Sequence, residues 1–180
     1  MDFKENTLNS EIVYKGKILE VYKDDVQIAD GKKSFREVVR HSGGVVITAL
    51  KDEHTILMVK QYRYPISKTV LELPAGKLEL NEEPLLAAQR ELEEETGYCA
   101  KKWKSLGYIN TSPGFSDEKL YLYLAQDLEF THCHPDDGEI IKSYECNLAE
   151  IFKMIKENKI NDAKTICGLT KCILEGVIKL

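Results

Sequence analysis

The chain has 180 residues, of which 43% are hydrophobic and 31% are charged, and its formal net charge is −5. This length and composition are typical of a globular protein with one main domain and a short appended segment, and they exclude a disordered tail or a fibrous repeat. The sequence has no long run of lysine and arginine, so we expect no nucleic acid among its partners. Apolar stretches such as residues 44–50 are much shorter than the roughly 20 residues of a membrane span. We therefore expect a cytoplasmic protein without a membrane partner.

Cysteine usage gives no sign of a disulfide framework. The five cysteines are an odd number without paired spacing, at Cys99, Cys133, Cys146, Cys167 and Cys172, so we expect reduced thiols with structural roles. The cluster of His132, Cys133 and His134 raises the alternative of a zinc site. Alternate residues of a strand point to opposite faces, however, and no second pair of ligands follows at zinc-finger spacing. We therefore assign no metal role to this cluster.

The N-terminal part of the chain predicts a small antiparallel ribbon. Between Glu11 and Arg40, apolar and polar residues alternate in two stretches that the turn sequence ADGK separates, as expected for a strand, a turn and a strand. A two-stranded ribbon is only marginally stable by itself. We therefore treat residues 1–40 as an appended module and residues 41–180 as the main domain.

The main domain combines strands with a few helices. Segments bounded by turn signals predict strands over residues 44–50, 55–63, 70–73, 104–109, 120–125 and 140–146. Segments with helical periodicity predict helices over residues 84–96, 148–157 and 163–177. The first of these helices is the best marked, because Pro84 suits a first helical position and Gly97 follows its end. This mixture of elements indicates an α+β sandwich.

Three glutamates share one face of the helix predicted over residues 84–96. Glu91, Glu94 and Glu95 stand at positions i, i+3 and i+4, beside the apolar stripe that faces the core. Like charges at this spacing repel each other, and Mg²⁺ or Mn²⁺ relieves the repulsion because a hard cation prefers carboxylate oxygen. Arg90 stands four residues before Glu94, so we expect its guanidinium to orient that carboxylate. A solvated charged face is the alternative interpretation.

The spacing around this helix matches a complete motif. It consists of Gly, five residues, Glu, seven residues, and then Arg, Glu, an apolar residue, any residue, Glu, Glu, any residue, Gly and an apolar residue. Its fixed positions are Gly76, Glu82, Arg90, Glu91, Leu92, Glu94, Glu95, Gly97 and Tyr98. The chain therefore resembles the Nudix hydrolases, which cleave a nucleoside diphosphate linked to another group. The resemblance implies an α/β/α sandwich with a mixed sheet. It also implies that Mg²⁺, with Mn²⁺ as a substitute, binds to Glu91, Glu94, Glu95 and the backbone carbonyl of Ala75.

A proline sixteen residues beyond Gly97 resembles the ADP-ribose pyrophosphatase branch of that family. This residue, Pro113, lies in the sequence TSPGFSDEKL, and the resemblance also covers the segments REVVRH, VKQYRYP, LELPAGKLE and DAKT. It implies that Pro113, Gly114, Phe115 and Glu118 contact the substrate. A simple turn is the alternative for this segment, because Pro and Gly are frequent in loops.

Three further residues are expected to contact the substrate. Arg63 ends an apolar strand, where its guanidinium can bind a phosphate through two N–H groups, although a surface arginine is the alternative. Arg36 resembles the position of the branch that faces the nucleobase, where a planar cation stacks on adenine. Glu37 beside it belongs to the same implied substrate site. The branch resemblance also implies a homodimer that is built through the N-terminal ribbon.

The resemblance implies a Mg²⁺-dependent pyrophosphatase that converts ADP-ribose and water to AMP and ribose 5-phosphate. Two alternatives stay open. The first is a pyrophosphatase for another nucleoside diphosphate sugar such as GDP-mannose, because base recognition depends on three-dimensional contacts. The second is a Nudix module that senses a nucleotide without cleaving it. Such a module is expected to lack the metal carboxylates, and no helix-turn-helix segment is evident in this sequence.

The residue that deprotonates the attacking water is expected outside the metal helix, since a carboxylate bound to a cation is a poor base. The branch resemblance places this base on a loop before a late strand, which corresponds to Glu139 in the sequence HPDDGEII. Asp136 and Asp137 are neighbouring alternatives, and an acidic surface turn is the structural alternative. Glu94 is the next candidate, so the expected catalytic residues are Glu139, Glu94 and Arg90.

Overall fold

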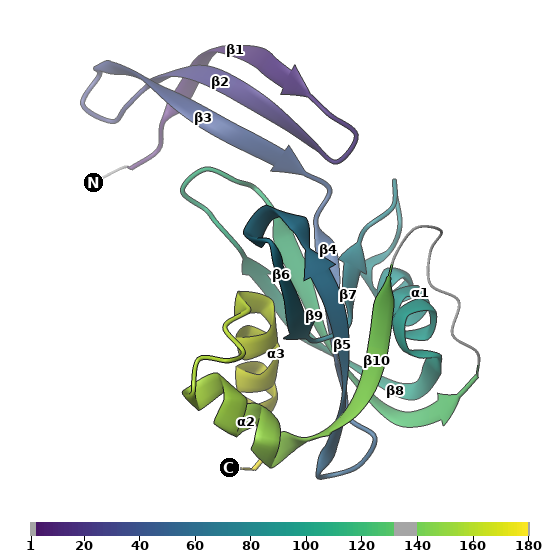
Figure 1. Cartoon of the computed structure of the whole chain (residues 1–180). Helices are drawn as coiled ribbons and strands as arrows, with labels where there is room; N and C mark the ends of the chain where they lie inside the picture. The colour runs from purple at the N-terminus through teal and green to yellow at the C-terminus, as the bar shows by residue number, and fades with distance from the viewer. Residues whose placement is uncertain (1–2, 132–139, 180) are drawn as a thin grey trace. The chain divides into compact units, whose positions relative to one another are not determined.

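The computed structural model describes residues 3–131 and 140–179 (Figure 1). The contacts within the chain divide it into two compact units. The first unit comprises Met1–Gly43 and Asn110–Lys119, and the second comprises Gly44–Ile109 and Leu120–Leu180. The first unit is therefore discontinuous in sequence, since it includes a loop from the middle of the chain.

The first unit is built on a three-stranded antiparallel sheet with the order β1-β2-β3. Its strands are β1 (Asn6–Lys15), β2 (Leu19–Gln27) and β3 (Lys33–His41). The prediction of only two strands is wrong, because a tight turn divides the first predicted strand. At this turn the N–H of Gly16 donates to the carbonyl of Leu19 at 2.9 Å. Alternation of apolar and polar residues continues on both sides, so periodicity alone does not reveal the turn.

Strand β1 leaves apolar side chains exposed. Every one of its residues is exposed. The exposed large hydrophobic side chains of the first unit include Leu8, Ile12, Val13, Tyr14 and Phe35. An exposed strand with so many apolar side chains is typical of an interaction surface.

The second unit contains two sheets. A mixed four-stranded sheet has the order β7-β4-β9-β8, with β4 parallel to β9 and antiparallel to β7. An antiparallel three-stranded sheet has the order β10-β5-β6. The strands are β4 (Gly44–Ala49), β5 (Thr55–Arg63), β6 (Lys68–Glu72), β7 (Ala75–Lys77), β8 (Tyr98–Asn110), β9 (Lys119–Phe130) and β10 (Ile141–Asn147).

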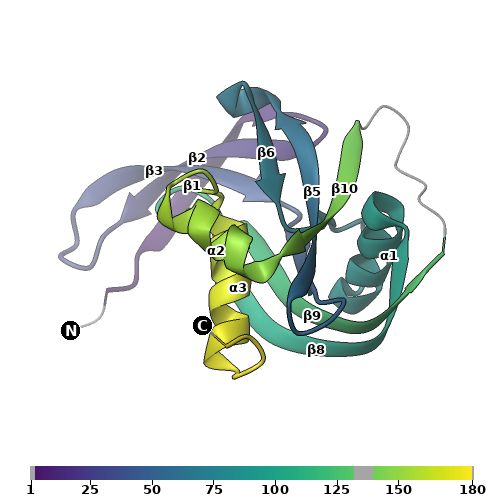
Figure 2. The same cartoon turned by 60° about the horizontal axis from the view of Figure 1, so that its bottom comes forward.

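Helices cover both sides of strand β4, so the second unit has α/β/α layers (Figure 1, Figure 2). These helices are α1 (Pro84–Thr96), α2 (Leu148–Lys156) and α3 (Ala163–Leu174). Val45 and Ile47 of β4 lie in the same apolar cluster as Leu92 of α1. Val46, which points the other way, lies in a second cluster with Leu169 of α3. Both faces of β4 are buried, and the predicted sandwich with a mixed sheet is confirmed.

The predicted helix over residues 84–96 is confirmed at both ends. Pro84 stands in its first turn. Gly97 ends the helix with a φ of 76°, and its N–H donates to the carbonyl of Glu93 at 2.8 Å. Glycine adopts this left-handed conformation readily. The helix packs on β4 and β7, which places its acidic face beside β7.

The other predicted segments differ from the structure mainly in length. The strand predicted over residues 104–109 is the second half of β8, and the last helix ends at Leu174 rather than at residue 177. Strand β7 is not predicted, because three residues are too few to show alternation. Within residues 3–131 and 140–179, no helix is long and apolar enough to cross a bilayer.

Candidate active site

The acidic face of α1 lies against strand β7. Glu95 is only 5% exposed, and its carboxylate accepts a hydrogen bond from the N–H of Ala75 at 2.9 Å. The Glu91 carboxylate lies over the backbone of Gly76, where a Cβ atom would come within 1.8 Å of Glu91 Cδ. A side chain at residue 76 would therefore displace the Glu91 carboxylate, which is a physical reason for glycine at the first position of the motif. The structure thus brings together Ala75, Glu91 and Glu95, which are three of the four predicted metal ligands.

Arg90 contacts three glutamates on or beside this face. Its Nε and Nη2 atoms donate to the two carboxylate oxygens of Glu82, at 2.9 and 3.0 Å. Its Nη1 atom donates to Glu91 Oε1 and to Glu94 Oε2, both at 2.9 Å. The contact with Glu94 is the one that the helical spacing predicts. Hydrogen bonding between Arg90 and Glu82 raises the pKa of the guanidinium and lowers the pKa of the carboxyl, so both groups stay charged.

Burial dominates the electrostatics of Glu95. It raises the pKa of this carboxyl to about 8, and the hydrogen bond from Ala75 opposes that effect. The charges of Glu91 and Glu72 raise the pKa further, whereas the charge of Arg63 lowers it. A buried carboxyl in these surroundings gains from a cation placed beside it, because the cation stabilises its ionised form.

The donors of this face fit a hard divalent cation. Its side-chain donors are carboxylate oxygens, the ligands that Mg²⁺ and Mn²⁺ prefer, and Glu95 contacts a backbone N–H rather than a cationic side chain. Among the residues that the structure describes, no three acidic, histidine or cysteine side chains form a group that could hold a metal ion. Arg90 instead occupies oxygens of Glu91 and Glu94. The fit therefore rests on the chemistry and burial of the donors.

Arg63, the predicted phosphate ligand, lies at the end of β5 and pairs with a buried carboxylate. Its Nε and Nη2 atoms each lie 2.8 Å from Glu72 Oε1. The other oxygen of Glu72 accepts a hydrogen bond from Lys164 of α3. The sequence patterns do not mark Glu72 and Lys164 as site residues. One signal for Glu72 is its place as a lone carboxylate in the apolar stretch VLEL, since a buried charge requires partners.

The predicted contacts of the TSPGF segment lie in the first unit, in the loop of residues 110–119. This loop runs beside β3, where the carbonyl of Phe115 accepts a hydrogen bond from the N–H of Val39 at 2.7 Å. Pro113 and Gly114 precede Phe115 in the same turn. Glu118 also belongs to this loop, and it accepts a hydrogen bond from the hydroxyl of a threonine in the loop at 2.7 Å.

Arg36 and Glu37 lie on β3, in the same unit as that loop. The guanidinium of Arg36 forms an ion pair with Glu5 and donates to the carbonyl of Phe35 at 2.7 Å. Glu37 is exposed. The structure therefore gathers Arg36, Glu37 and the predicted substrate contacts of the TSPGF segment in the first unit, and the predicted metal and phosphate ligands in the second.

Some predictions fall on residues 132–139, outside the described residues. They concern the predicted base Glu139, its alternatives Asp136 and Asp137, and the cluster of residues 132–134. Their roles stay predictions of the sequence.

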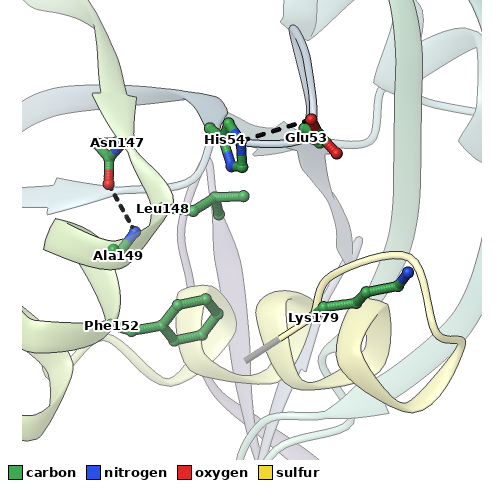
Figure 3. A pocket seen from close by; sticks show the side chains of 7 residues that line it. All are labelled: Glu53, His54, Asn147, Leu148, Ala149, Phe152 and Lys179. Atoms are coloured by element: carbon green, nitrogen blue, oxygen red, sulfur yellow. Dashed lines mark hydrogen bonds and ion pairs between the residues drawn. The ribbon is translucent and has the colours of Figure 1, made fainter.

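A separate cavity of about 370 Å³ lies where β10 meets α2 (Figure 3). Its lining residues are Glu53, His54, Asn147, Leu148, Ala149, Phe152 and Lys179. Asn147 caps α2 by accepting a hydrogen bond from the N–H of Ala149 at 2.9 Å. None of the predicted site residues is among those that line this cavity. The predicted metal and phosphate ligands of the second unit lie on α1, on β7 and at the end of β5.

Comparisons with known proteins identify the class of the chain. A model of the NUDIX domain matches residues 40–169. A model of the nucleoside diphosphate sugar hydrolase N-terminal domain matches residues 5–39. The chain therefore belongs to the Nudix hydrolase family, whose enzymes generally use a divalent metal.

Similar proteins match the chain over almost its whole length. An ADP-ribose pyrophosphatase of Bacillus subtilis is 43% identical over 164 residues, which cover 90% of this chain and 89% of that protein. A methanol dehydrogenase activator of Bacillus methanolicus is 40% identical over 179 residues, which cover 98% of this chain and 97% of that protein. The crystal structure of an ADP compounds hydrolase matches with a TM-score of 0.84 at 22% identity and covers 97% of each chain. That structure confirms the fold.

Proposed function

We propose that this chain is a Mg²⁺-dependent pyrophosphatase that hydrolyses ADP-ribose to AMP and ribose 5-phosphate. The observation that carries the proposal is the acidic face of α1, where Glu91 and the buried Glu95 lie against Ala75 and Gly76 of β7. The 43% identity to the ADP-ribose pyrophosphatase of Bacillus subtilis supports the choice of substrate.

The residues of the second unit have three proposed roles, which are to bind the metal, to orient its ligands and to bind a phosphate. Magnesium would neutralise the charge of the pyrophosphate and supply an activated water when held by the proposed ligands Ala75, Glu91, Glu94 and Glu95. Arg90 orients Glu91 and Glu94 through a single nitrogen atom. Arg63 binds a phosphate of the substrate, because a guanidinium pairs with phosphate oxygens through parallel N–H groups.

The first unit is proposed to select the substrate and to form a homodimer. Arg36 stacks on the adenine and Glu37 lies beside it, while the loop with Pro113, Gly114, Phe115 and Glu118 contacts the rest of the nucleotide. The exposed apolar side chains of β1 support the proposal of a dimer, since a partner would cover them. A cytoplasmic location stays a prediction of the composition.

A substrate panel tests the proposed function. The protein is incubated with Mg²⁺ and ADP-ribose, GDP-mannose or other nucleoside diphosphate derivatives, and the products are separated by chromatography. We expect ADP-ribose to be among the best substrates and to give AMP and ribose 5-phosphate. We also expect no hydrolysis after EDTA removes the metal. Preference for GDP-mannose would favour the alternative sugar nucleotide. Binding without turnover of any compound would favour a sensing module.

Glu139→Gln is expected to lower kcat by roughly a hundredfold, because the variant lacks the proposed base. Mg²⁺ binding is expected to change little, and higher pH should restore part of the rate because hydroxide replaces the missing base. The measurements are a pH profile of kcat and a Mg²⁺ titration of the melting temperature, with the exposed Glu53→Gln as control.

Substitutions of the neighbouring carboxylates show whether the base is assigned to the wrong residue. A larger loss after substitution of Asp136 or Asp137, with Glu139→Gln silent, would move the base by two or three residues. Unchanged rates in all three variants would leave Glu94 as the next candidate.

Activation of a methanol dehydrogenase is a second candidate function. The observation that favours it is the 40% identity to the activator of Bacillus methanolicus over 98% of this chain. Addition of the protein to a methanol dehydrogenase assay, with and without Mg²⁺, tests this candidate. A higher dehydrogenase rate would support it, and an unchanged rate would leave the pyrophosphatase as the function.

A further inference from the structure

Arg63, Glu72 and Lys164 form an ion network that runs from the interior of the second unit to its surface. The side chain of Glu72 is 1% exposed, that of Lys164 is 13% exposed and that of Arg63 is 38% exposed. Arg63 is therefore the member that is open enough to contact a solute. The network joins strands β5 and β6 to helix α3, and Lys164 follows Glu72 by 92 residues in the sequence.

Each carboxylate oxygen of Glu72 has its own cationic partner. Oε1 accepts a hydrogen bond from Nε of Arg63 at 2.8 Å and forms an ion pair with Nη2 at the same distance, and Oε2 accepts a hydrogen bond from Nζ of Lys164. Among the described residues, the contacts of the Arg63 guanidinium with Glu72 involve Nε and Nη2. Nη1 takes no part in these contacts, so it can donate to a phosphate while the pair with Glu72 stays in place.

The beginning of α3 fixes Lys164 in turn. Asp162 accepts hydrogen bonds from the N–H and the hydroxyl of Thr165, at 3.0 and 2.6 Å, and from Lys164 at 3.1 Å. The hydroxyl oxygen of Thr165 accepts a hydrogen bond from the N–H of Leu73 at 2.9 Å. Because Leu73 follows Glu72 in the chain, the first turn of α3 holds both the backbone and the carboxylate at the end of β6.

Orientation of Arg63 explains this network better than stabilisation of the fold does. A buried ion pair seldom stabilises a fold better than apolar side chains of the same size, so stability alone is a weak reason for its presence. A guanidinium that is already held in one conformation loses less entropy when it binds a phosphate. Glu72 also stands three residues before Ala75, whose N–H donates to Glu95 on the acidic face of α1, where the proposed reaction takes place.

We propose that Glu72 and Lys164 are positioning residues that hold the Arg63 guanidinium in the orientation that binds a phosphate of the nucleoside diphosphate substrate. This inference rests on the proposed pyrophosphatase function. If the inference holds, Glu72 affects substrate binding only when Arg63 is present. A purely structural role of Glu72 would not depend on Arg63.

A double-mutant cycle between Glu72 and Arg63 tests the proposal. Glu72→Gln keeps the size of the side chain and removes its charge. With Arg63 present, we expect KM for ADP-ribose to rise roughly tenfold, as for the loss of one charge-assisted hydrogen bond, and kcat to change by less than about twofold. In the Arg63→Ala background, the same substitution is expected to change KM by less than about twofold, because the group that it positions is gone.

Substitutions of Lys164 supply a second measurement. Lys164→Met is expected to raise KM in the same direction, and Lys164→Arg to restore it, because arginine keeps the charge and the donors. The matched control is Lys159→Gln, which removes an exposed ion pair with Glu157 at 2.7 Å. We expect this control to leave KM and kcat at their wild-type values.

The outcomes separate the positioning role from the proposed function. Equal effects of Glu72→Gln with and without Arg63, in an enzyme that hydrolyses ADP-ribose, would overturn the positioning role alone. If Glu72→Gln does not fold, Lys164→Met in the two Arg63 backgrounds decides by the same criterion. Failure of the wild-type protein to hydrolyse any nucleoside diphosphate derivative would overturn the proposed function and this inference together.

Discussion

Glu95→Gln is expected to lower kcat for ADP-ribose by roughly three orders of magnitude while the fold stays intact. Glutamine has nearly the same shape, and its amide oxygen can still accept the hydrogen bond that Ala75 donates to Glu95 at 2.9 Å. The substitution removes the carboxyl group that a bound cation would hold in its ionised form. Without metal, the variant is expected to be at least as stable as the wild type, because burial raises the pKa of the Glu95 carboxyl to about 8 and its ionisation therefore weakens the fold as the pH rises.

Kinetics and thermal melts together check this expectation. Mg²⁺ should raise the melting temperature of the wild type and leave that of Glu95→Gln unchanged. Glu94→Gln is expected to lower kcat in the same direction. Glu83→Gln is a suitable control, because Glu83 precedes α1 and its side chain makes no capping hydrogen bond. Nearly wild-type turnover in both Glu94→Gln and Glu95→Gln would show that the acidic face is only a solvated surface.

Removal of residues 1–40 is expected to abolish activity and to give a monomer. It takes away strand β1 with its exposed apolar side chains and, with it, the proposed dimer surface. It also removes Arg36 and Glu37, and it leaves the loop of residues 110–119 without most of its partner strand β3. Light scattering reports the mass of the particle, and turnover of ADP-ribose reports the activity.

A point variant separates the dimer from the substrate contacts. Ile12→Lys places a charge among the exposed apolar side chains of β1, so we expect a weaker dimer. The variant keeps every proposed substrate ligand, so its substrate contacts are expected to stay intact. Asn9→Lys adds the same charge to β1 without removing an apolar side chain, and it serves as control. A monomeric truncation of residues 1–40 with full activity would contradict both the proposed dimer and the proposed role of the ribbon.

Local interactions explain which features the sequence predicts well. Helix α1 follows from Pro84, Gly97 and the spacing between them, and the contact between Arg90 and Glu94 follows from one helical turn. The apolar sequence of β4 also indicates burial on both faces. These features depend on neighbours along the chain, so spacing is sufficient to find them. The mixed sheet, in contrast, is implied only by the resemblance to the Nudix hydrolases.

Contacts between distant segments explain what the sequence does not reveal. The buried pair of Glu72 and Lys164 joins residues 92 positions apart, and a lone glutamate in a strand does not name its partner. The third strand of the first unit is missed because the turn at Gly16 interrupts a continuous alternation. The roles of Arg36, Glu37, Arg63 and the TSPGF loop stay predictions, because they concern a substrate.

The discontinuity of the first unit limits how this unit can be exchanged between relatives. The N–H of Val39 donates to Phe115 at 2.7 Å, and the N–H of Asp117 donates back to Val39 at 3.2 Å. The boundary between the two family models, at residues 39 and 40, falls inside β3 and places this loop in the second model. A chimaera that takes only its N-terminal segment from a relative would therefore join a foreign strand to a native loop. Recombination that preserves the hydrogen bonds between them has to transfer both segments as a pair.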